Sequence, residues 1–292
     1  MFSFSQTSRG FFCLEWSSTE DGPKIVHLQH VKIPNDLSDK NILKNIVDNF
    51  DSNLKTQSDS LSVIFDNESV LFSLVKIDLE SNNEKLINWY EAKVMDDSFN
   101  SMYYNCYFPM DSNNNCLLVS IPKKIQDNII NSSKIMGFNL VYLSVDIFSA
   151  SVLASRLYQK ETQNEYLIWK INNNNNHMLV SYNKDKIKLF LKLKVHSNNI
   201  TVDFVLGPNN ELEKVKSFIN NILINKKIDE SFENVFIYQT KDNLSLLRKI
   251  LDKKYTNIRL LDLYSLVENK TYDKFKCIPY VENGICFKGL DL

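Results

Sequence analysis

Few residues in this sequence have a type and spacing that could support catalysis or metal binding. His27 and His30 lie three positions apart, and Cys13 lies close to Glu15, so a metal site and a thiol nucleophile are the chemistries to consider. The two histidines alternate with apolar residues, as in a β-strand, and no cysteine pair accompanies them. No histidine lies near Cys13 in the sequence. We therefore expect neither a metal ion nor a cysteine nucleophile.

Paired carboxylates are the next candidates, at Asp96–Asp97 and at Asp51 and Asp59. Nothing in the sequence places them in a pocket, so we interpret them as solvated loop residues. The chain has no G-x-S-x-G, H-E-x-x-H, phosphate-loop or dinucleotide-binding motif. The cysteines form no C-x-x-C pair and lie in or beside apolar runs, which predicts buried free thiols at Cys13, Cys106, Cys116, Cys277 and Cys286.

Composition restricts the class of protein further. The chain has 292 residues, a hydrophobic fraction of 43% and a net charge of −1. This length and hydrophobicity predict a globular protein with two domains or lobes, and the balanced charge argues against a nucleic-acid partner. The sequence begins with no secretion signal and contains no run of about 18 apolar residues. We expect a cytosolic protein that reaches a membrane only through a partner.

Hydrophobic periodicity predicts the elements of the first half. Ser81 and Glu84 form a capping-box pattern at the start of one helix, Pro122 lies at the start of another, and Gly137 ends that second helix. The predicted strands cover residues 11–16, 24–31, 61–65, 70–77, 103–108, 116–121 and 140–145, and the helices cover 37–50, 81–93, 122–137 and 146–158.

The second half repeats this order of elements. The predicted meander has strands at 166–171, 178–182 and 187–193, and a long helix follows at 210–224. A strand at 235–238, a helix at 244–253 and a strand at 258–261 complete the second half. Two successive units of this kind predict an α/β fold of the actin-like (ribonuclease H-like) class, with two lobes of mixed sheets flanked by helices. The first lobe comprises residues 1–158 and 277–292, and the shorter second lobe comprises residues 159–276.

Lysines alternate with apolar residues from Lys184 to Lys194. This pattern favours a half-buried strand with a solvated lysine face, at the edge of a sheet. The alternative is a docking face for an acidic partner or a lipid surface.

Three segments carry a resemblance to a known family. Leu86–Ala92 is similar to an I-x-W-E-A helix, and Cys116–Lys124 is similar to a strand that ends before a helix with a basic first turn. In Ser133–Leu157, a Gly-Phe-Asn turn precedes Val145-Asp146-Ile147-Phe148-Ser149-Ala150, and Ala154, Arg156 and Leu157 complete the pattern. Together with the tail Asn283–Asp291, these segments resemble the PilM family of actin-like proteins of type IV pilus and type II secretion assembly.

The resemblance implies a nucleotide cleft, but three elements of that cleft depart from the family pattern. Where the family has D-I-G-S-S, this chain has Leu14-Glu15-Trp16-Ser17-Ser18. Lys170 stands near the acid of the second hairpin, followed by Asn172 and Asn173 without a glycine, and Gln239-Thr240 replace a glycine pair. A magnesium nucleotide needs a carboxylate, a backbone that can approach phosphate, and space. We therefore expect no cofactor and no ATP hydrolysis.

The resemblance also implies a partner-binding subdomain, inserted at about residues 78–145. Aromatic side chains in this segment could anchor a peptide: Trp89, Tyr90, Tyr103, Tyr104, Tyr107 and Phe108. The expected function is a non-catalytic scaffold on the cytoplasmic face of a pilus or type II secretion machine, bound to the short cytoplasmic tail of a bitopic inner-membrane protein. The alternatives are a diverged ATPase related to sugar kinases and Hsp70, or a filament-forming cell-division actin relative. Oligomerisation is left open.

Overall fold

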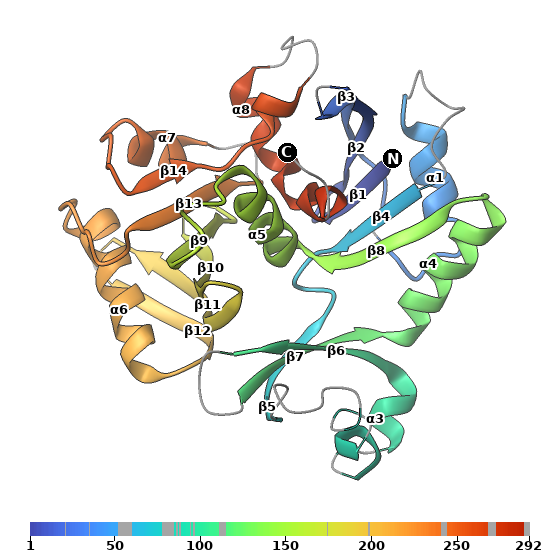
Figure 1. The fold of residues 1–292 in the computed structure, drawn as a ribbon, viewed down its shortest axis with the longest axis horizontal. Coiled ribbons are helices and arrows are strands. Elements are labelled where there is room, and N and C mark those ends of the chain that lie inside the picture. Colours follow the sequence, from blue (N-terminus) through green and yellow to red (C-terminus); the bar gives the residue numbers. More distant parts are fainter. Residues whose placement is uncertain are drawn as a thin grey trace.

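The computed structural model describes residues 1–20, 22–34, 36–51, 60–77, 85, 87, 89–93, 95, 97–110, 115–173, 175–197, 199–240, 244–267 and 273–288. The described residues form three β-sheets with helices packed against them (Figure 1). Two large sheets lie in the two lobes, and a smaller third sheet lies beside both.

The first large sheet has the strand order β3-β2-β1-β4-β8. Strands β1 (Phe2–Thr7), β2 (Gly10–Thr19) and β3 (Gly22–Val31) are antiparallel, and β4 (Ser60–Phe65) and β8 (Asn139–Val145) run parallel to β1. Helices α1 (Ile42–Asn49) and α4 (Lys123–Ile135) contact each other beside this sheet. Pro122 precedes α4, and Gly137, at φ +77°, follows its last turn, as the sequence predicts. Strand β1 is not among the strands predicted from sequence.

The second large sheet has the order β12-β11-β10-β9-β13-β14. Its strands are β9 (Glu165–Ile171), β10 (Asn176–Asn183), β11 (Lys186–His196), β12 (Asn199–Leu206), β13 (Asn234–Gln239) and β14 (Ile258–Leu260). Its helices are α6 (Asn209–Ile219), continued by the π-helical turn η1 (Asn220–Ile224), and α7 (Ser245–Leu251). The sequence predicts no strand at β12, which pairs with the lysine-rich β11. The expectation that β11 is an edge strand is therefore wrong.

Pairing in the two large sheets follows one pattern. β1 pairs antiparallel with β2 and parallel with β4, and β9 pairs in the same way with β10 and β13. β8 and β14 continue the two sheets in parallel on the far side of β4 and β13. The internal repeat predicted from the order of elements is therefore confirmed, and the architecture is the expected two-lobed α/β fold.

Two helical segments lie between the large sheets. Helix α5 (Asp146–Leu157) leads from β8 to the second lobe, and the 3₁₀ helix η3 (Ile278–Phe287) packs along it (Figure 1). Gly284 lies at their contact, where a Cβ atom would meet the Leu153 Cβ and the Ser149 carbonyl oxygen at 2.6 Å. The absence of a side chain there allows the close approach of the two backbones. The short segments η2 (Tyr264–Leu266) and α8 (Lys274–Cys277) precede η3.

The third sheet is inserted between β4 and α4. It comprises β5 (Leu71–Lys76), β7 (Asn115–Pro122) and β6 (Tyr103–Pro109), in the order β5-β7-β6, with α3 (Asp97–Met102) before β6. This small sheet starts at residue 71 rather than at about 78. It ends at 122 rather than 145, because α4 and β8 belong to the first lobe. The predicted capping box at Ser81 and Glu84 lies outside the described residues.

A continuous apolar core extends through both lobes, and a smaller one forms beneath the small sheet around Val75, Ile77, Cys116 and Leu118. All five cysteines are free, four of them buried and Cys106 half-buried. In the part of the chain that the structure describes, no helix has the length and apolarity needed to cross a membrane.

Candidate functional site

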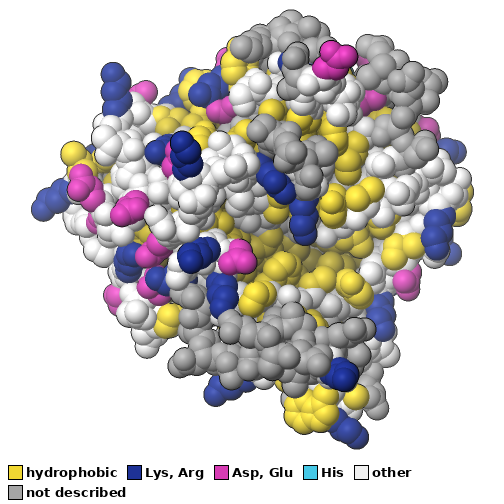
Figure 2. Space-filling view, in the orientation of Figure 1, with side chains coloured by type: hydrophobic (Ala, Val, Ile, Leu, Met, Phe, Trp, Pro, Cys, Tyr) yellow, Lys and Arg dark blue, Asp and Glu magenta, His cyan; other side chains and the backbone are white. Residues whose placement is uncertain are grey.

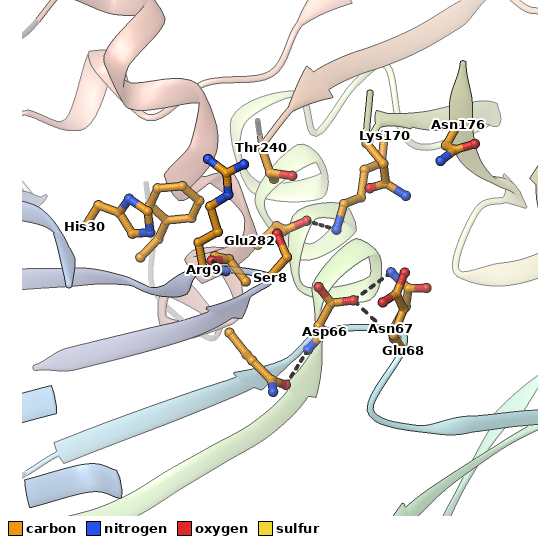
Figure 3. A pocket seen from close by; sticks show the side chains of 14 residues that line it. Ser8, Arg9, His30, Asp66, Asn67, Glu68, Lys170, Asn176, Thr240 and Glu282 are labelled. Carbon is orange, nitrogen blue, oxygen red and sulfur yellow. Dashed lines mark hydrogen bonds and ion pairs between the residues drawn. The ribbon is translucent and has the colours of Figure 1, made fainter. Parts of the chain in front are cut away.

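A cavity of about 420 Å³ opens between the two lobes (Figure 3). It lies where parallel strands of both large sheets end, which is the position where α/β proteins bind ligands. The first lobe contributes the β1–β2 turn and the residues after β4, and the second lobe contributes the ends of β9 and β13. The lining residues include Gln6, Thr7, Ser8, Arg9, Asp66, Asn67, Glu68, Lys170, Asn172, Asn176, Thr240 and, from η3, Glu282.

The β1–β2 turn is held by its own polar groups. The Thr7 hydroxyl donates to the Gly10 carbonyl oxygen at 3.2 Å and accepts from the Arg9 backbone N–H at 3.1 Å. Gly10 has φ +126°, and a Cβ atom there would lie 2.1 Å from the Val31 carbonyl oxygen. This glycine is therefore required by the neighbouring strand β3.

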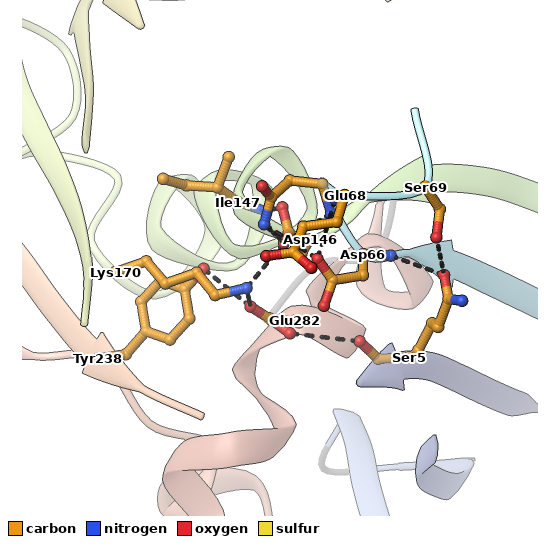
Figure 4. Close-up of polar contacts among 11 residues, drawn as sticks. Ser5, Asp66, Glu68, Ser69, Asp146, Ile147, Lys170, Tyr238 and Glu282 are labelled. Atoms are coloured by element: carbon orange, nitrogen blue, oxygen red, sulfur yellow. Dashed lines mark hydrogen bonds and ion pairs between the residues drawn. The ribbon is translucent and has the colours of Figure 1, made fainter. Parts of the chain in front are cut away.

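Lys170 lies at the base of the cavity, where it is 3% exposed (Figure 4). Its Nζ is 2.7 Å from Asp146 Oδ2 and 2.5 Å from Glu282 Oε1, and both carboxylates are buried. Asp146 is the first residue of α5 and Glu282 lies in η3, so this lysine of the second sheet binds both helical segments between the lobes.

Further hydrogen bonds hold the two carboxylates. Asp146 Oδ2 accepts from the backbone N–H and the side-chain amide of Asn67, at 3.1 and 2.9 Å. The Tyr238 hydroxyl donates to Glu282 Oε1 at 3.3 Å, and the Ser5 hydroxyl donates to Glu282 Oε2 at 3.4 Å. Ser5 belongs to β1 and Tyr238 to β13, so Glu282 is held from both large sheets.

These contacts shift the pKa values of the two carboxyl groups in opposite directions. Burial raises the pKa of Glu282 to about 8, because the nearby Lys170 cation offsets only part of the cost of ionising it. Burial would raise the pKa of Asp146 too, but Lys170 and the donors from Asn67 and Ile147 outweigh it and hold that pKa below its usual value. The pKa of Lys170 is raised, because its acidic neighbours outweigh its burial. Lys170 and Asp146 therefore carry opposite charges, and Glu282 takes up a proton more readily than an ordinary glutamate does.

Asp66 is a third acid near Lys170, at the end of β4. Its backbone N–H donates to Gln6 Oε1 at 3.1 Å, which ties the end of β4 to β1. Burial raises the pKa of Asp66, and the neighbouring Asp146 adds to this effect. The base of the cavity is thus crowded with acids around one buried ammonium group.

The structure separates the residues expected at the nucleotide site. Lys170, Asn172 and Thr240 line the cavity, and Asn173 shapes the β9–β10 turn by accepting from the backbone N–H groups of Asn175 and Asn176. Gln239 is buried beside the cavity, at the end of β13.

The expected first hairpin does not line the cavity. Glu15, Trp16, Ser17 and Ser18 lie on β2, and Trp16 packs against Phe287 with ring centroids 5.6 Å apart. Because β1 was not predicted, the expected cleft turn was assigned to the hairpin after the correct one. The turn that corresponds to the β9–β10 turn is Thr7–Gly10, between β1 and β2.

Sequence reasoning missed the acids that surround Lys170, namely Asp146, Glu282 and Asp66. Two signals were present. Asp146 follows a predicted strand at the start of a helix, and Glu282 is the only charged residue in the run Ile278–Phe287. An isolated acid in an apolar segment needs a buried partner, and Lys170 was the unexplained cation.

The residues at the base of the cavity do not fit the magnesium ion that the resemblance implies. The buried Lys170 ammonium already occupies the space between Asp146 and Glu282, and a divalent cation there would be repelled by it. Within the described residues, no group of three or more His, Cys, Asp or Glu side chains is arranged to hold a metal ion. His27 packs against Phe50 and His30 against Phe12; both are half-buried on β3, and His30 also lines the cavity.

The six predicted anchor residues do not form one surface. Tyr90, Tyr103 and Tyr107 lie on the face covered by the helical residues before β6, where the Tyr107 hydroxyl donates to Glu91 Oε1 at 2.9 Å and Tyr103 stacks on Phe99. Phe108 lies on the opposite face, which is directed at the lobes, and stacks on Phe148 of α5 with ring centroids 5.3 Å apart. Trp89 and Tyr104 are exposed by 58% and 43%.

A hollow lined by hydrophobic side chains lies in the middle of the face in Figure 2, where Figure 1 has β8 above the small sheet. β8 is the outermost strand of its sheet, and β5 and β6 are the outer strands of theirs. These strands carry exposed apolar side chains at Val141, Leu74 and Tyr104. Apolar side chains beside outer strands are typical of surfaces that bind extended peptides.

No protein-family model and no curated protein sequence matches the chain. Among solved structures, it is similar to a chain of a PilM-PilN type IV pilus biogenesis complex, with a TM-score of 0.61 and 13% identity over 99% of this chain and 98% of that one. It also matches a Bacteroides thetaiotaomicron protein with an actin-like ATPase fold and unknown function, with a TM-score of 0.48, 11% identity and 92% of each chain covered.

A third similar structure is the cytoplasmic domain of EpsL, an inner-membrane component of the Vibrio cholerae type II secretion system. It has a TM-score of 0.43 and 11% identity, over 86% of this chain and 94% of that one. At these identities the likeness concerns the fold alone. The fold is actin-like, and the resemblance to PilM that the sequence suggests is confirmed at that level.

Proposed function

We propose that this protein is a non-catalytic, actin-like scaffold of a type IV pilus or type II secretion assembly. In this proposal it lies on the cytoplasmic side of the inner membrane and binds the cytoplasmic tail of a bitopic membrane protein. The observation that carries the proposal is the Lys170 contact with Asp146 and Glu282, which fills the base of the cleft with the protein's own charges.

Loss of catalysis follows from the chemistry of phosphoryl transfer. ATP hydrolysis depends on a metal ion that neutralises the phosphates and on a residue that orients the attacking water. Here Asp146 accepts from Lys170 and Asn67, and Glu282 accepts from Lys170, Tyr238 and Ser5, so neither carboxylate is available to hold a metal ion or to orient water. We expect no phosphate release above background from ATP with magnesium, and steady turnover would contradict a non-catalytic role.

Partner binding is supported by the hollow beside the small sheet and by the comparison. The PilM-PilN structure is a complex between two proteins, and its similarity to this chain extends over nearly the whole length of both. The exposed Tyr104 offers a rigid aromatic contact on the lobe-directed side of β6, and Val141 offers an exposed apolar side chain on β8. We infer that the partner's tail binds here as an extended segment.

Calorimetric titration tests the partner half of the proposal. The probes are synthetic peptides of the short cytoplasmic tails of bitopic proteins encoded beside this chain. One of them should bind the wild type, and Tyr104→Ser should weaken that binding at least about 10-fold. The matched control is Ile228→Ser, which removes a more exposed apolar side chain, at 71%, from the second lobe. Equal weakening by both variants, or no binding by any tail, would contradict the proposed surface.

A second candidate, a protein that binds a nucleotide without hydrolysing it, is favoured by the mouth of the cavity. The cavity has a volume of about 420 Å³, which is within the usual range for small-molecule sites, and Arg9 and Ser8 are among its lining residues. This candidate requires the phosphates to bind without the metal ion that the base of the cleft does not fit.

A further inference from the structure

Lys170 is the only lysine or arginine that is buried in the part of the chain the structure describes. It projects from β9 of the second lobe, whereas Asp146 follows directly on β8 of the first lobe. Glu282 completes the contact from η3 and is itself bound by Ser5 of β1. Figure 4 shows these side chains converging from different elements on one point. A single ammonium group therefore joins the second sheet to the first lobe and to η3.

Such a contact favours one arrangement of the lobes. If the lobes separated, the Lys170 ammonium would move away from the Asp146 carboxylate. Asp146 would stay buried at the start of α5, because it also accepts two hydrogen bonds from Asn67. An uncompensated buried charge is costly, so separation is disfavoured for as long as Asp146 remains in place. Tyr238 reinforces the contact, because its hydroxyl reaches Glu282 from β13.

We propose that the Lys170 ammonium is a built-in cation that holds the two lobes together, so that the closed cleft needs no bound ligand. In this chain the positive charge among the cleft acids comes from a lysine side chain. The inference does not rest on the proposed partner, since it concerns the cleft of the free protein.

The first test removes the charge and the side chain separately. Lys170→Met keeps the length of the side chain, and Lys170→Ala leaves a space beside Asp146, Glu282 and Asp66. Both should lower the Tm, by roughly 6–20 °C. Both should also raise the radius of gyration in small-angle scattering, by about 1 Å over the roughly 19 Å expected for this length.

Lys188→Met is the matched control. Lys188 also contacts two carboxylates, Glu211 at 2.8 Å and Glu165 at 3.6 Å, but all three residues belong to the second lobe. This variant should lower the Tm without changing the radius of gyration. An unchanged radius for both Lys170 variants, or the same expansion in Lys188→Met, would overturn the proposal.

The second test asks whether another cation can replace the ammonium. Millimolar manganese chloride or methylammonium chloride should raise the Tm of Lys170→Ala by roughly 5 °C and reverse its expansion, measured against potassium chloride of equal ionic strength. Wild type and Lys170→Met should not respond, because their side chains fill the space. No response from Lys170→Ala to either cation would contradict the proposal.

A measurement on the wild type covers the case in which the Lys170 variants do not fold. NMR of protein labelled with ¹⁵N-lysine should show one ammonium group with slowly exchanging protons, and its signal should be unaffected by millimolar magnesium chloride. Lysine ammonium signals that all exchange rapidly would overturn the proposal, since a solvated lysine cannot hold the lobes together.

Discussion

Among the contacts between the second lobe and the rest of the molecule, two differ clearly in chemistry. At the base of the cleft, Lys170 contacts Asp146 and Glu282. Beside the small sheet, the rings of Phe72, Phe108, Phe148 and Phe190 pack together with centroids 4.6–6.2 Å apart. The charged connection depends on direction and pH, whereas the aromatic one depends mainly on the apolar area buried.

This difference indicates separate roles for the two connections. A buried ion pair adds little net stability but penalises the loss of either partner, so it specifies one arrangement of the lobes. Aromatic packing is non-directional by comparison and contributes stability at any pH. We interpret the aromatic cluster as the main source of stability between the small sheet and the second lobe. We interpret the Lys170 contact as the one that fixes how the two lobes lie against each other.

The largest expected loss of stability comes from the aromatic connection. Phe148→Ala removes a 6% exposed ring that contacts Phe72, Phe108 and Phe190, and should lower the free energy of unfolding by about 3–5 kcal/mol. Chemical denaturation at pH 5 and pH 8 should give the same loss, because no titrating group is removed. A loss that depends strongly on pH would contradict the division into two kinds of connection.

A smaller loss is expected where the two helical segments carrying the acids cross. Gly284→Ala places a Cβ atom 2.6 Å from Leu153 Cβ and the Ser149 carbonyl oxygen, so α5 and η3 must move apart. We expect a loss of about 1–3 kcal/mol, measured by chemical denaturation. Gly137→Ala is an informative comparison, because its Cβ would meet no atom within 4 Å and only its φ of +77° is unfavourable. A Gly284→Ala variant as stable as wild type would show that the helices are not in close contact.

The charged connection should make stability depend on pH. Folding raises the pKa of Glu282 from 4.5 to about 8, so the folded state binds a proton that the unfolded state releases. This contribution is fully present below about pH 4.5 and is lost as the pH rises toward 8. Glu282→Gln cannot ionise, so it should gain more than about 1 kcal/mol relative to wild type between pH 5 and pH 8. Parallel curves of stability against pH for the two proteins would contradict a raised pKa of Glu282.

The smallest effect on stability is expected at the proposed partner surface, away from both connections. Tyr104 is 43% exposed, so Tyr104→Ser should change the free energy of unfolding by less than about 0.5 kcal/mol. Its effect should appear only in peptide binding. Thermal unfolding of the free protein measures the first expectation, and a large loss there would show that Tyr104 belongs to the core of the small sheet.

Much of the fold could be predicted from the sequence, because apolar periodicity marks strands whose two faces differ. Strand β1 escaped this reasoning because its serines are buried as fully as its phenylalanines: Ser3 and Ser5 face η3, where Asn283 and Glu282 satisfy them. Strand β12 alternates in burial along its whole length, so its pattern was present in the sequence, and the strand was missed all the same.

The site was predicted less completely than the fold. The sequence indicates Lys170 as a cation near the place of an acid, but its partners lie 24 and 112 residues away, in segments whose proximity only the tertiary structure establishes. The missing strand β1 also moved the expected first turn from Thr7–Gly10 to Glu15–Ser18. Because one strand was missed, the four residues from Glu15 to Ser18 were wrongly assigned to the cleft. The two-lobed architecture was still predicted.

The central claim is that the charges of the cleft are satisfied by Lys170 and leave no place for a magnesium nucleotide. Calorimetric titration of the wild-type protein with ATP and magnesium tests this most directly. We predict no saturable binding heat at ATP concentrations up to the millimolar range, and no change in Tm under the same conditions. Saturable binding with a micromolar Kd that depends on magnesium would contradict the account.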